Sequence, residues 1–317
     1  MLTEYCPYPV PMPLPPLPTP WNVFNLRASP YWQESLGGSD AAHPLSLFVG
    51  RAAELAALEA VLYGAGESSS RQAVAGAPGV GKTTLVKELK ARARDRGYFT
   101  VDDFAAMLPG DTPDALFGRV LALVYETILA NRPMTAGNPA MQAAQQLVRA
   151  GQVTTGGGGG VSVLGVGASA SKAGALTTPK DLMLDGPRVL RDLMSLARGA
   201  DAHGVLVHVN NLENLSEADA TASADVLRAL RDPMLLHPGL HVVVVGTTDA
   251  VQTVVHTHQQ VRHTFSTQVV QPLGADDVHA LLAARYAYGR LDERAPAVSP
   301  VDAAAVEDLH GLYRGDL

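Results

Sequence analysis

The segment VAGAPGVGKTTLV, residues 74–86, constrains the fold of this chain more than any other stretch. It fits the pattern G-x-x-x-x-G-K-[ST], in which successive backbone N–H groups and a helix N-terminus face phosphate groups. A short apolar run, RQAVAG, precedes the glycines, and a segment with helical periodicity follows them, which is the context that the pattern requires. The predicted nucleotide-binding residues are Gly76, Ala77, Pro78, Gly79, Val80, Gly81, Lys82, Thr83 and Thr84.

Two side chains of this loop have predicted roles with a bound nucleotide and Mg²⁺. Lys82 is expected to reach the β- and γ-phosphates, and the Thr83 hydroxyl is expected to bind the magnesium ion.

Apolar strand-like runs alternate with helical segments from about residue 71 to residue 272. Two of the runs, GVLVHV and LHVVVVG, are continuous in the way that is typical of strands buried in a parallel sheet. The alternation predicts an α/β fold of the P-loop type, with a parallel sheet between helices. The expected domains are an arm over residues 1–45, a core over residues 46–272 and a partial helical lid over residues 273–317.

Several finer predictions accompany this fold. GYFTVDDFAAM is expected to form a second strand. Helices are expected over residues 113–131, over residues 139–150, in a segment with Pro187 in its first turn, and from Thr248 to about Arg262. A glycine-rich insertion near residues 151–180 contains five consecutive glycines, residues 156–160, and is interpreted either as a loop that contacts a substrate or subunit or as a flexible surface excursion.

Hydrolysis of a nucleotide requires an acid that holds the metal ion and a group that activates water, and the strand that should supply them ends in amides. The run GVLVHV is followed by Asn210 and Asn211, and the first carboxylate is that of Glu213. An amide can bind a metal ion or orient water, but it cannot accept a proton. Asn210 is therefore the candidate metal ligand, and Asn210 and Asn211 are candidates to orient the attacking water. Glu213 either reaches back to the metal ion or its water, or is a surface carboxylate beside the next helix, in which case hydrolysis is expected to be slow. Asp102 and Asp103 are expected to lie too far along the sheet.

Two further candidates have structural alternatives. Thr247 or Thr248, after the run VVVVG, is expected either to sense the γ-phosphate or to cap the next helix. Arg262 is expected either to stabilise transition-state charge in a neighbouring subunit or to compensate a helix dipole at the surface.

The N-terminal arm combines two unusual compositions. Residues 7–20 contain eight prolines, which predicts an extended polyproline segment that either binds a protein partner or tethers the arm. Trp21 and Trp32, beside Phe24 and Tyr31, predict an arm that docks on another surface.

Composition limits the partners and the location. The net charge of −7 gives no support for a nucleic-acid-binding face, although a local basic patch stays possible. No apolar run approaches the roughly 18–20 residues that a membrane span needs, and no signal peptide is apparent, so a cytoplasmic protein without a membrane partner is expected. The single cysteine, Cys6, fits a reducing compartment. His256, His258 and His263 lack the spacing of helical zinc ligands.

The order of these segments resembles that of the AAA+ ATPases, and within them the origin-initiator and STAND-like signalling branches. LFVGRAAELAAL resembles the box before their glycine loop, GAPGVGKT their Walker A motif, and VLVHVNNLEN and VVVVGTTD the positions of Walker B and sensor 1. The resemblance implies that Phe48, Val49 and Gly50 line the adenine site, that Thr247 or Thr248 is sensor 1, and that Arg262 is the arginine finger. It also implies ATP as the nucleotide and a homo-oligomer joined through the nucleotide interface.

Two departures from that family pattern bear on function. Walker B has amides where acids are usual, and the lid motif around LYRGDL, which in the family usually continues into a sensor 2 arginine, is followed only as far as Leu317. Either further residues complete the lid, or this protein dispenses with them. The winged-helix domain of the initiators is also not in the sequence, so the resemblance implies no DNA binding. Three functions therefore stay open: an oligomerising ATPase that remodels or recruits a partner, a nucleotide-gated binding module that does not hydrolyse ATP, and an accessory ATPase in a DNA transaction such as replication, transposition or defence.

Overall fold

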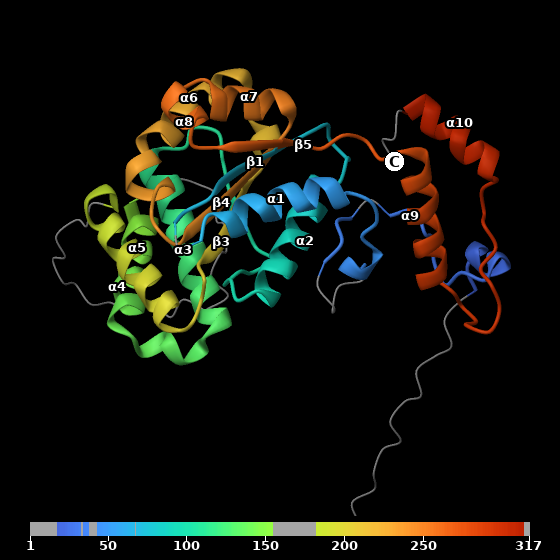
Figure 1. The fold of residues 1–317 in the computed structure, drawn as a ribbon, viewed down its shortest axis with the longest axis horizontal. Coiled ribbons are helices and arrows are strands. Elements are labelled where there is room, and N and C mark those ends of the chain that lie inside the picture. Colours follow the sequence, from blue (N-terminus) through green and yellow to red (C-terminus); the bar gives the residue numbers. More distant parts are fainter. Residues whose placement is uncertain (1–17, 33, 38–42, 67, 155–181, 314–317) are drawn as a thin grey trace, which may run out of the picture.

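A parallel sheet forms the centre of the molecule (Figure 1). The computed structural model describes residues 18–32, 34–37, 43–66, 68–154 and 182–313. Within these residues the sheet has five strands in the order β2-β3-β4-β1-β5, and all of the pairings are parallel. The strands are β1 (Arg71–Ala75), β2 (Ala105–Ala106), β3 (Val205–Asn210), β4 (Leu240–Gly246) and β5 (Ser266–Val269). This sheet confirms the predicted α/β fold class.

Helices cover both faces of the sheet, and side-chain alternation along the strands separates two apolar clusters. On one face, Val74, Leu206 and Val243 pack against α1 (Ala52–Gly64) and α2 (Lys82–Asp95). On the other face, the cluster built on Ala73, Val207 and Val242 is covered by six helices. These helices are α3 (Pro113–Asn131), α4 (Pro139–Thr154), α5 (Leu182–Gly199), α6 (Glu217–Ala229), α7 (Thr248–His256) and α8 (Gln259–Arg262).

The continuous apolar runs are the central strands, as predicted, because every residue of β3 and β4 is buried. The predicted second strand is largely wrong. Phe99 makes one isolated bridge to Val205, and regular pairing resumes only in the two residues of β2. Between them the chain bulges away from β3, and the Lys90 ammonium donates to the carbonyls of Val101 and Asp103, both at 2.8 Å.

Three other boundaries differ from the sequence predictions. Pro187 lies inside α5, which begins at Leu182, and not in its first turn. The helix expected up to Arg262 is interrupted after His256, and α8 is a separate short helix. Pro20, at the end of the expected polyproline segment, begins the 3-10 helix η1 (Pro20–Phe24). The rest of that segment that precedes residue 18, and the five glycines of residues 156–160, lie outside the described residues.

The segment expected as the lid, and called the lid below, contains α9 (Ala275–Tyr288) and α10 (Ala303–Tyr313), and the N-terminal arm packs on these helices. Leu26 of the arm is fully buried in a cluster with Val278, Leu282 and Tyr286 of α9. In Figure 1 the blue arm segment accordingly lies beside the red lid helices, although the two are separated by more than two hundred residues of sequence.

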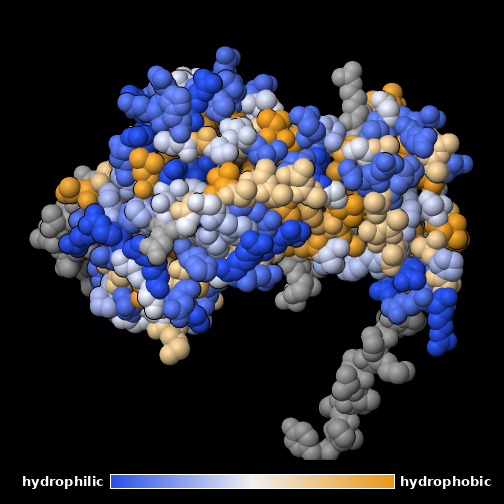
Figure 2. Space-filling view, viewed as in Figure 1, coloured by the Kyte–Doolittle hydropathy of each residue, from blue (hydrophilic) through white to orange (hydrophobic). Residues whose placement is uncertain are grey.

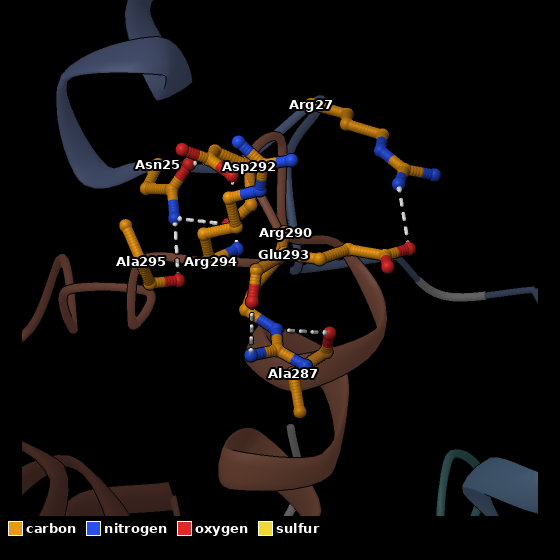
Figure 3. A network of polar contacts seen from close by, with 8 residues as sticks. All are labelled: Asn25, Arg27, Ala287, Arg290, Asp292, Glu293, Arg294 and Ala295. Atoms are coloured by element: carbon orange, nitrogen blue, oxygen red, sulfur yellow. Dashed lines mark hydrogen bonds and ion pairs between the residues drawn. The ribbon is translucent and has the colours of Figure 1, made fainter.

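Polar contacts add to this packing (Figure 3). The Asn25 amide donates to the carbonyls of Asp292 and Ala295, at 3.0 and 2.9 Å, and its oxygen accepts from the Asp292 N–H at 2.8 Å. The Arg285 guanidinium lies 4.5 Å from the centre of the Trp32 ring and also donates to the carbonyl of Pro30. The arm therefore docks on the lid of its own chain.

Candidate phosphate-binding site

The phosphate loop, residues 76–81, joins the carboxyl end of β1 to the first residue of α2. Gly79 and Gly81 have φ angles of 80° and 87°, in the left-handed region that favours glycine. A Cβ on Gly76 would lie 2.6 Å from the carbonyl oxygen of Val270, so only glycine fits beside the chain that leaves β5. The glycines are therefore required by the backbone path, and the path leaves the first N–H groups of α2 without helical partners.

Lys82 is buried at the start of α2, with 8% of its surface exposed. Its ammonium group donates to the carbonyl of Gly76 at 3.1 Å and to the carbonyl of Ala77 at 2.7 Å. The cation is thus held within the loop, next to the backbone that would surround a phosphate group.

The segment before α1 contacts both the phosphate loop and the lid. Phe48 packs against the cluster beneath α1 and α2. Gly50 has a φ of 70°, and a Cβ on it would lie 3.1 Å from Leu273 and from the Asp277 carboxyl carbon. Arg51, a residue that sequence reasoning passed over, donates to the carbonyl of Val80 in the phosphate loop at 3.0 Å. The structure therefore brings the residues expected around adenine to the border between core and lid.

Asn210 ends β3 with 7% of its surface exposed, and its side-chain oxygen has no hydrogen-bond partner. By strand alternation it shares a face with Leu206, which packs against α2. A buried carbonyl oxygen without a partner is costly, and it is the kind of ligand that Mg²⁺ takes. The side chain at this position therefore fits a metal ion or a water molecule bound to one.

Asn211 directly precedes the short helix η4 (Leu212–Asn214), and Glu213 lies within it. Asn211 has a φ of 73° and caps this helix. Asparagine tolerates the left-handed region better than most residues, so the backbone by itself accounts for an amide here. The side chain of Glu213 lies outside what the structure describes.

The remaining candidates divide between the two edges of the sheet. Thr247 lies at the carboxyl end of β4, next to β1, and its hydroxyl accepts the Ala250 N–H at 3.3 Å as the cap of α7. Thr248 is the first residue of that helix and is exposed.

Arg262 is exposed at the end of α8, before β5 begins, and therefore lies toward the amino edge of the sheet, away from the phosphate loop. Asp102 and Asp103 are exposed near β2, with two strands between β2 and β1.

Two titratable side chains are buried beneath the site, between α2 and β3. Burial lowers the pKa of Lys90 to about 7, against the opposing attraction of Asp102 and Asp103. Burial also lowers the pKa of His208 well below its ordinary value, and the charges of Lys90 and Lys87 add to the effect. His208 is therefore neutral at physiological pH, and neither of its ring nitrogens has a partner. Within the described ranges no three acidic, histidine or cysteine side chains group as a metal site.

Comparison with protein families identifies one match, to the AAA ATPase domain, over residues 47–245. Comparison with curated proteins gives no match. Similar solved structures include the ORC2 protein of Aeropyrum pernix in its ADP form, with 16% identity and a TM-score of 0.42 over 82% of this chain and 56% of that one. Its ADPNP–ADP complexes give 17% identity and a TM-score of 0.36, over 74% and 51% of the two chains.

Cdc6p from Pyrobaculum aerophilum gives 15% identity and a TM-score of 0.40, over 83% of this chain and 60% of that chain. The chain thus spans between 51% and 60% of the length of these proteins. Among the residues that the structure describes, no helix is both long and apolar enough to cross a membrane.

Proposed function

The chain belongs to the AAA ATPase domain family, and we propose that it binds ATP with Mg²⁺ and uses the bound nucleotide to control oligomerisation and the recruitment or remodelling of a partner. Hydrolysis is proposed to be slow. The single observation that carries this proposal is a complete phosphate loop at the carboxyl end of β1, with the buried, unpartnered amide of Asn210 at the carboxyl end of β3 in the same sheet.

The loop residues fit the triphosphate of a nucleotide. The left-handed backbone at Gly79 and Gly81 and the absent side chain at Gly76 make the closely packed concave backbone that phosphate oxygens need. Lys82 is already buried among the loop carbonyls and supplies the cation.

The donor set for magnesium is composed of neutral oxygen atoms. The hydroxyl of Thr83, at the first turn of α2, and the side-chain oxygen of Asn210 are the ligands proposed on the protein side. Mg²⁺ accepts such ligands when phosphate oxygens and water complete its shell. A bound Mg²⁺ would neutralise charge that develops on the phosphates.

Slow hydrolysis is expected because Asn210 and Asn211 cannot accept a proton from water. Glu213 stays the candidate base, from its place in η4 directly after the strand. If the chain binds ATP without any turnover, it is the non-hydrolysing, nucleotide-gated module that the two amides also favour.

Oligomerisation is supported by the position of Arg262 and by the surface. Because Arg262 lies toward the sheet edge opposite the loop, a role in charge stabilisation requires the site of another copy. Figure 2 shows a band of apolar, orange to tan surface that runs from the middle of the molecule to the lid. On α10, Leu309 and Leu312 are 44% and 71% exposed. Such surface is typical of regions that contact another protein.

The experiment that tests nucleotide binding is equilibrium titration of the wild type and Lys82→Ala with ATP, with and without Mg²⁺. The wild type is expected to bind, with higher affinity in the presence of Mg²⁺, whereas Lys82→Ala is expected to lose most of the affinity. Lys87, a half-buried lysine of the same helix that donates to Ser35 and not to the phosphate loop, provides the matched control Lys87→Ala. Absence of binding by the folded wild type, or equal binding by Lys82→Ala, would refute the proposal.

A further inference from the structure

We propose that Arg51 is a positioning residue for phosphate recognition, an inference that rests on the proposed function. Its guanidinium holds the Val80 carbonyl so that the next N–H group, that of Gly81, faces the bound phosphates.

The contacts of Arg51 are specific and buried. One terminal nitrogen donates to the Val80 carbonyl at 3.0 Å, and the other pairs with the Glu54 carboxylate at 3.0 Å. The side chain of Arg51 is 7% exposed, and that of Glu54 is 18% exposed. Because Glu54 fixes one edge of the planar guanidinium, the other edge has a defined direction toward the loop.

The hydrogen bond from Arg51 to the Val80 carbonyl determines the orientation of the peptide group between Val80 and Gly81. In a planar trans peptide the C=O and the following N–H point in opposite directions. A carbonyl that points to Arg51, at the start of α1, therefore turns the Gly81 N–H away from α1. Gly81 is the N-cap of α2, so its N–H group has no partner within the helix and is free to serve an anion.

The backbone conformation at position 51 does not favour arginine. The arginine is therefore explained by the contacts of its side chain. Arg51 is the N-cap of α1 with a φ of 63°, in the left-handed region. Glycine, serine, threonine, asparagine or aspartate is the usual residue at an N-cap, and a left-handed backbone costs an arginine more than it costs glycine. The side-chain contact with the phosphate loop offsets the conformational free energy that the left-handed backbone costs at this position.

The same segment joins the phosphate loop to the lid. Gly50, also left-handed, packs against Leu273, just before α9, and against Asp277 in the first turn of α9, and Arg51 follows Gly50 directly. A shift of the lid against Gly50 is thereby transmitted to the residue that orients the loop. Arg51 thus acts on the phosphates, whereas the neighbouring residues Phe48, Val49 and Gly50 are the ones expected at the adenine ring.

The test compares the affinities of the full chain for ATP and for adenosine in the wild type, Arg51→Met and Arg51→Lys. Arg51→Met is expected to bind ATP on the order of tenfold more weakly, since it loses a charge-assisted hydrogen bond. Its affinity for adenosine, which has no phosphate, is expected to change by less than about twofold. Arg51→Lys keeps a donor for Val80 and is expected to recover part of the ATP affinity.

Three controls separate this role from a structural one. Arg92→Met removes an arginine that is half exposed on α2 and paired with Glu88, and it is expected to bind both ligands as the wild type does. Thermal unfolding and circular dichroism report whether Arg51→Met folds. Should it not fold, Glu54→Gln, which keeps the guanidinium but loosens its direction, is expected to give a smaller loss of ATP affinity in the same sense.

The binding results distinguish failure of the positioning role of Arg51 from failure of the proposed function. Equal losses for ATP and adenosine, or ATP binding by Arg51→Met at the wild-type affinity, overturn the positioning role. A wild-type chain that binds neither ATP nor adenosine refutes the proposed function instead, and the two failures are therefore distinguishable.

Discussion

At the scale of single residues, the two amides after β3 have different origins. Asn210 is buried with an unpartnered oxygen, which points to a ligand, whereas Asn211 occupies a left-handed position that favours asparagine. The sequence showed the two amides together, and only the backbone separates their roles. Backbone dihedral angles depend on how the chain turns into η4, which a residue pattern does not specify.

A pair of substitutions tests this reading of Asn211. Asn211→Gly keeps the left-handed backbone and is expected to change the free energy of unfolding by less than about 0.5 kcal/mol. Asn211→Val forces a β-branched residue into the same conformation and is expected to cost roughly 1–2 kcal/mol. Chemical denaturation measures both values. A large loss with glycine would show that the amide side chain itself is needed.

The buried Lys90 predicts a pH dependence of stability. Its pKa is about 7 in the fold and 10.5 when it is unperturbed, so between these values the unfolded chain binds more protons than the folded one. Stability from this group therefore rises with pH through that window, by up to roughly 1.4 kcal/mol per pH unit. Denaturant unfolding between pH 7.5 and pH 9 is expected to show a steeper rise for the wild type than for Lys90→Met. Equal slopes would contradict the burial of Lys90.

At the scale of elements, sequence periodicity located the core well because apolar runs and burial coincide. Every residue of β3 and β4 is buried, and β1 leads into the phosphate loop as its motif required. The short pairing of β2 with β3 was not predictable from the sequence. The chain before β2 is held by Lys90 of α2, which donates hydrogen bonds to the carbonyls of Val101 and Asp103. The break between α7 and α8 likewise has no proline or glycine to signal it.

The arm is the element whose partner sequence reasoning left undefined. Its aromatic residues indicated docking, but the acceptor surface is formed by α9 and the chain after it, more than two hundred residues away. A contact of this range is determined by the whole fold, and local patterns carry no information about it.

Asn25 provides a test of how the arm is held. It combines a left-handed backbone, with a φ of 57°, and four side-chain hydrogen bonds to the chain between α9 and α10. Asn25→Gly keeps the backbone and loses the bonds, whereas Asn25→Ala loses both. Hydrogen exchange of residues 20–32 and 289–298 is expected to accelerate in both variants, and more in Asn25→Ala. Unchanged exchange in both would show that Leu26 and the aromatic residues suffice to hold the arm.

At the scale of the whole molecule, the parallel sheet and the phosphate loop agree with the match to the AAA ATPase domain. Oligomerisation and the recruitment or remodelling of a partner are proposed. The sheet places Arg262 away from the loop of its own chain, so activity that depends on this arginine requires a second copy.

Sedimentation velocity over a range of protein concentrations tests that requirement. With ATP and Mg²⁺ the wild type is expected to form oligomers, while Lys82→Ala, which should not hold the nucleotide, is expected to stay smaller. Arg262→Ala is expected to bind ATP as the wild type does, because the residue is remote from its own loop. A single monomeric species under all conditions would contradict the proposed oligomerisation.

We propose that this chain holds ATP in a complete phosphate loop but hydrolyses it slowly, because Asn210 occupies the position at which an acid would hold the metal ion. The most direct measurement is the rate of ATP hydrolysis by the wild type and by Asn210→Asp, at saturating ATP and Mg²⁺, with binding measured in parallel. The wild type is expected to bind ATP and turn over far below about 1 s⁻¹, the lower end of typical enzyme rates. Asn210→Asp is expected to be faster by about tenfold or more, since a carboxylate holds Mg²⁺ more strongly than an amide does. Wild-type turnover at about 1 s⁻¹ or above, or no acceleration in Asn210→Asp, would contradict the account.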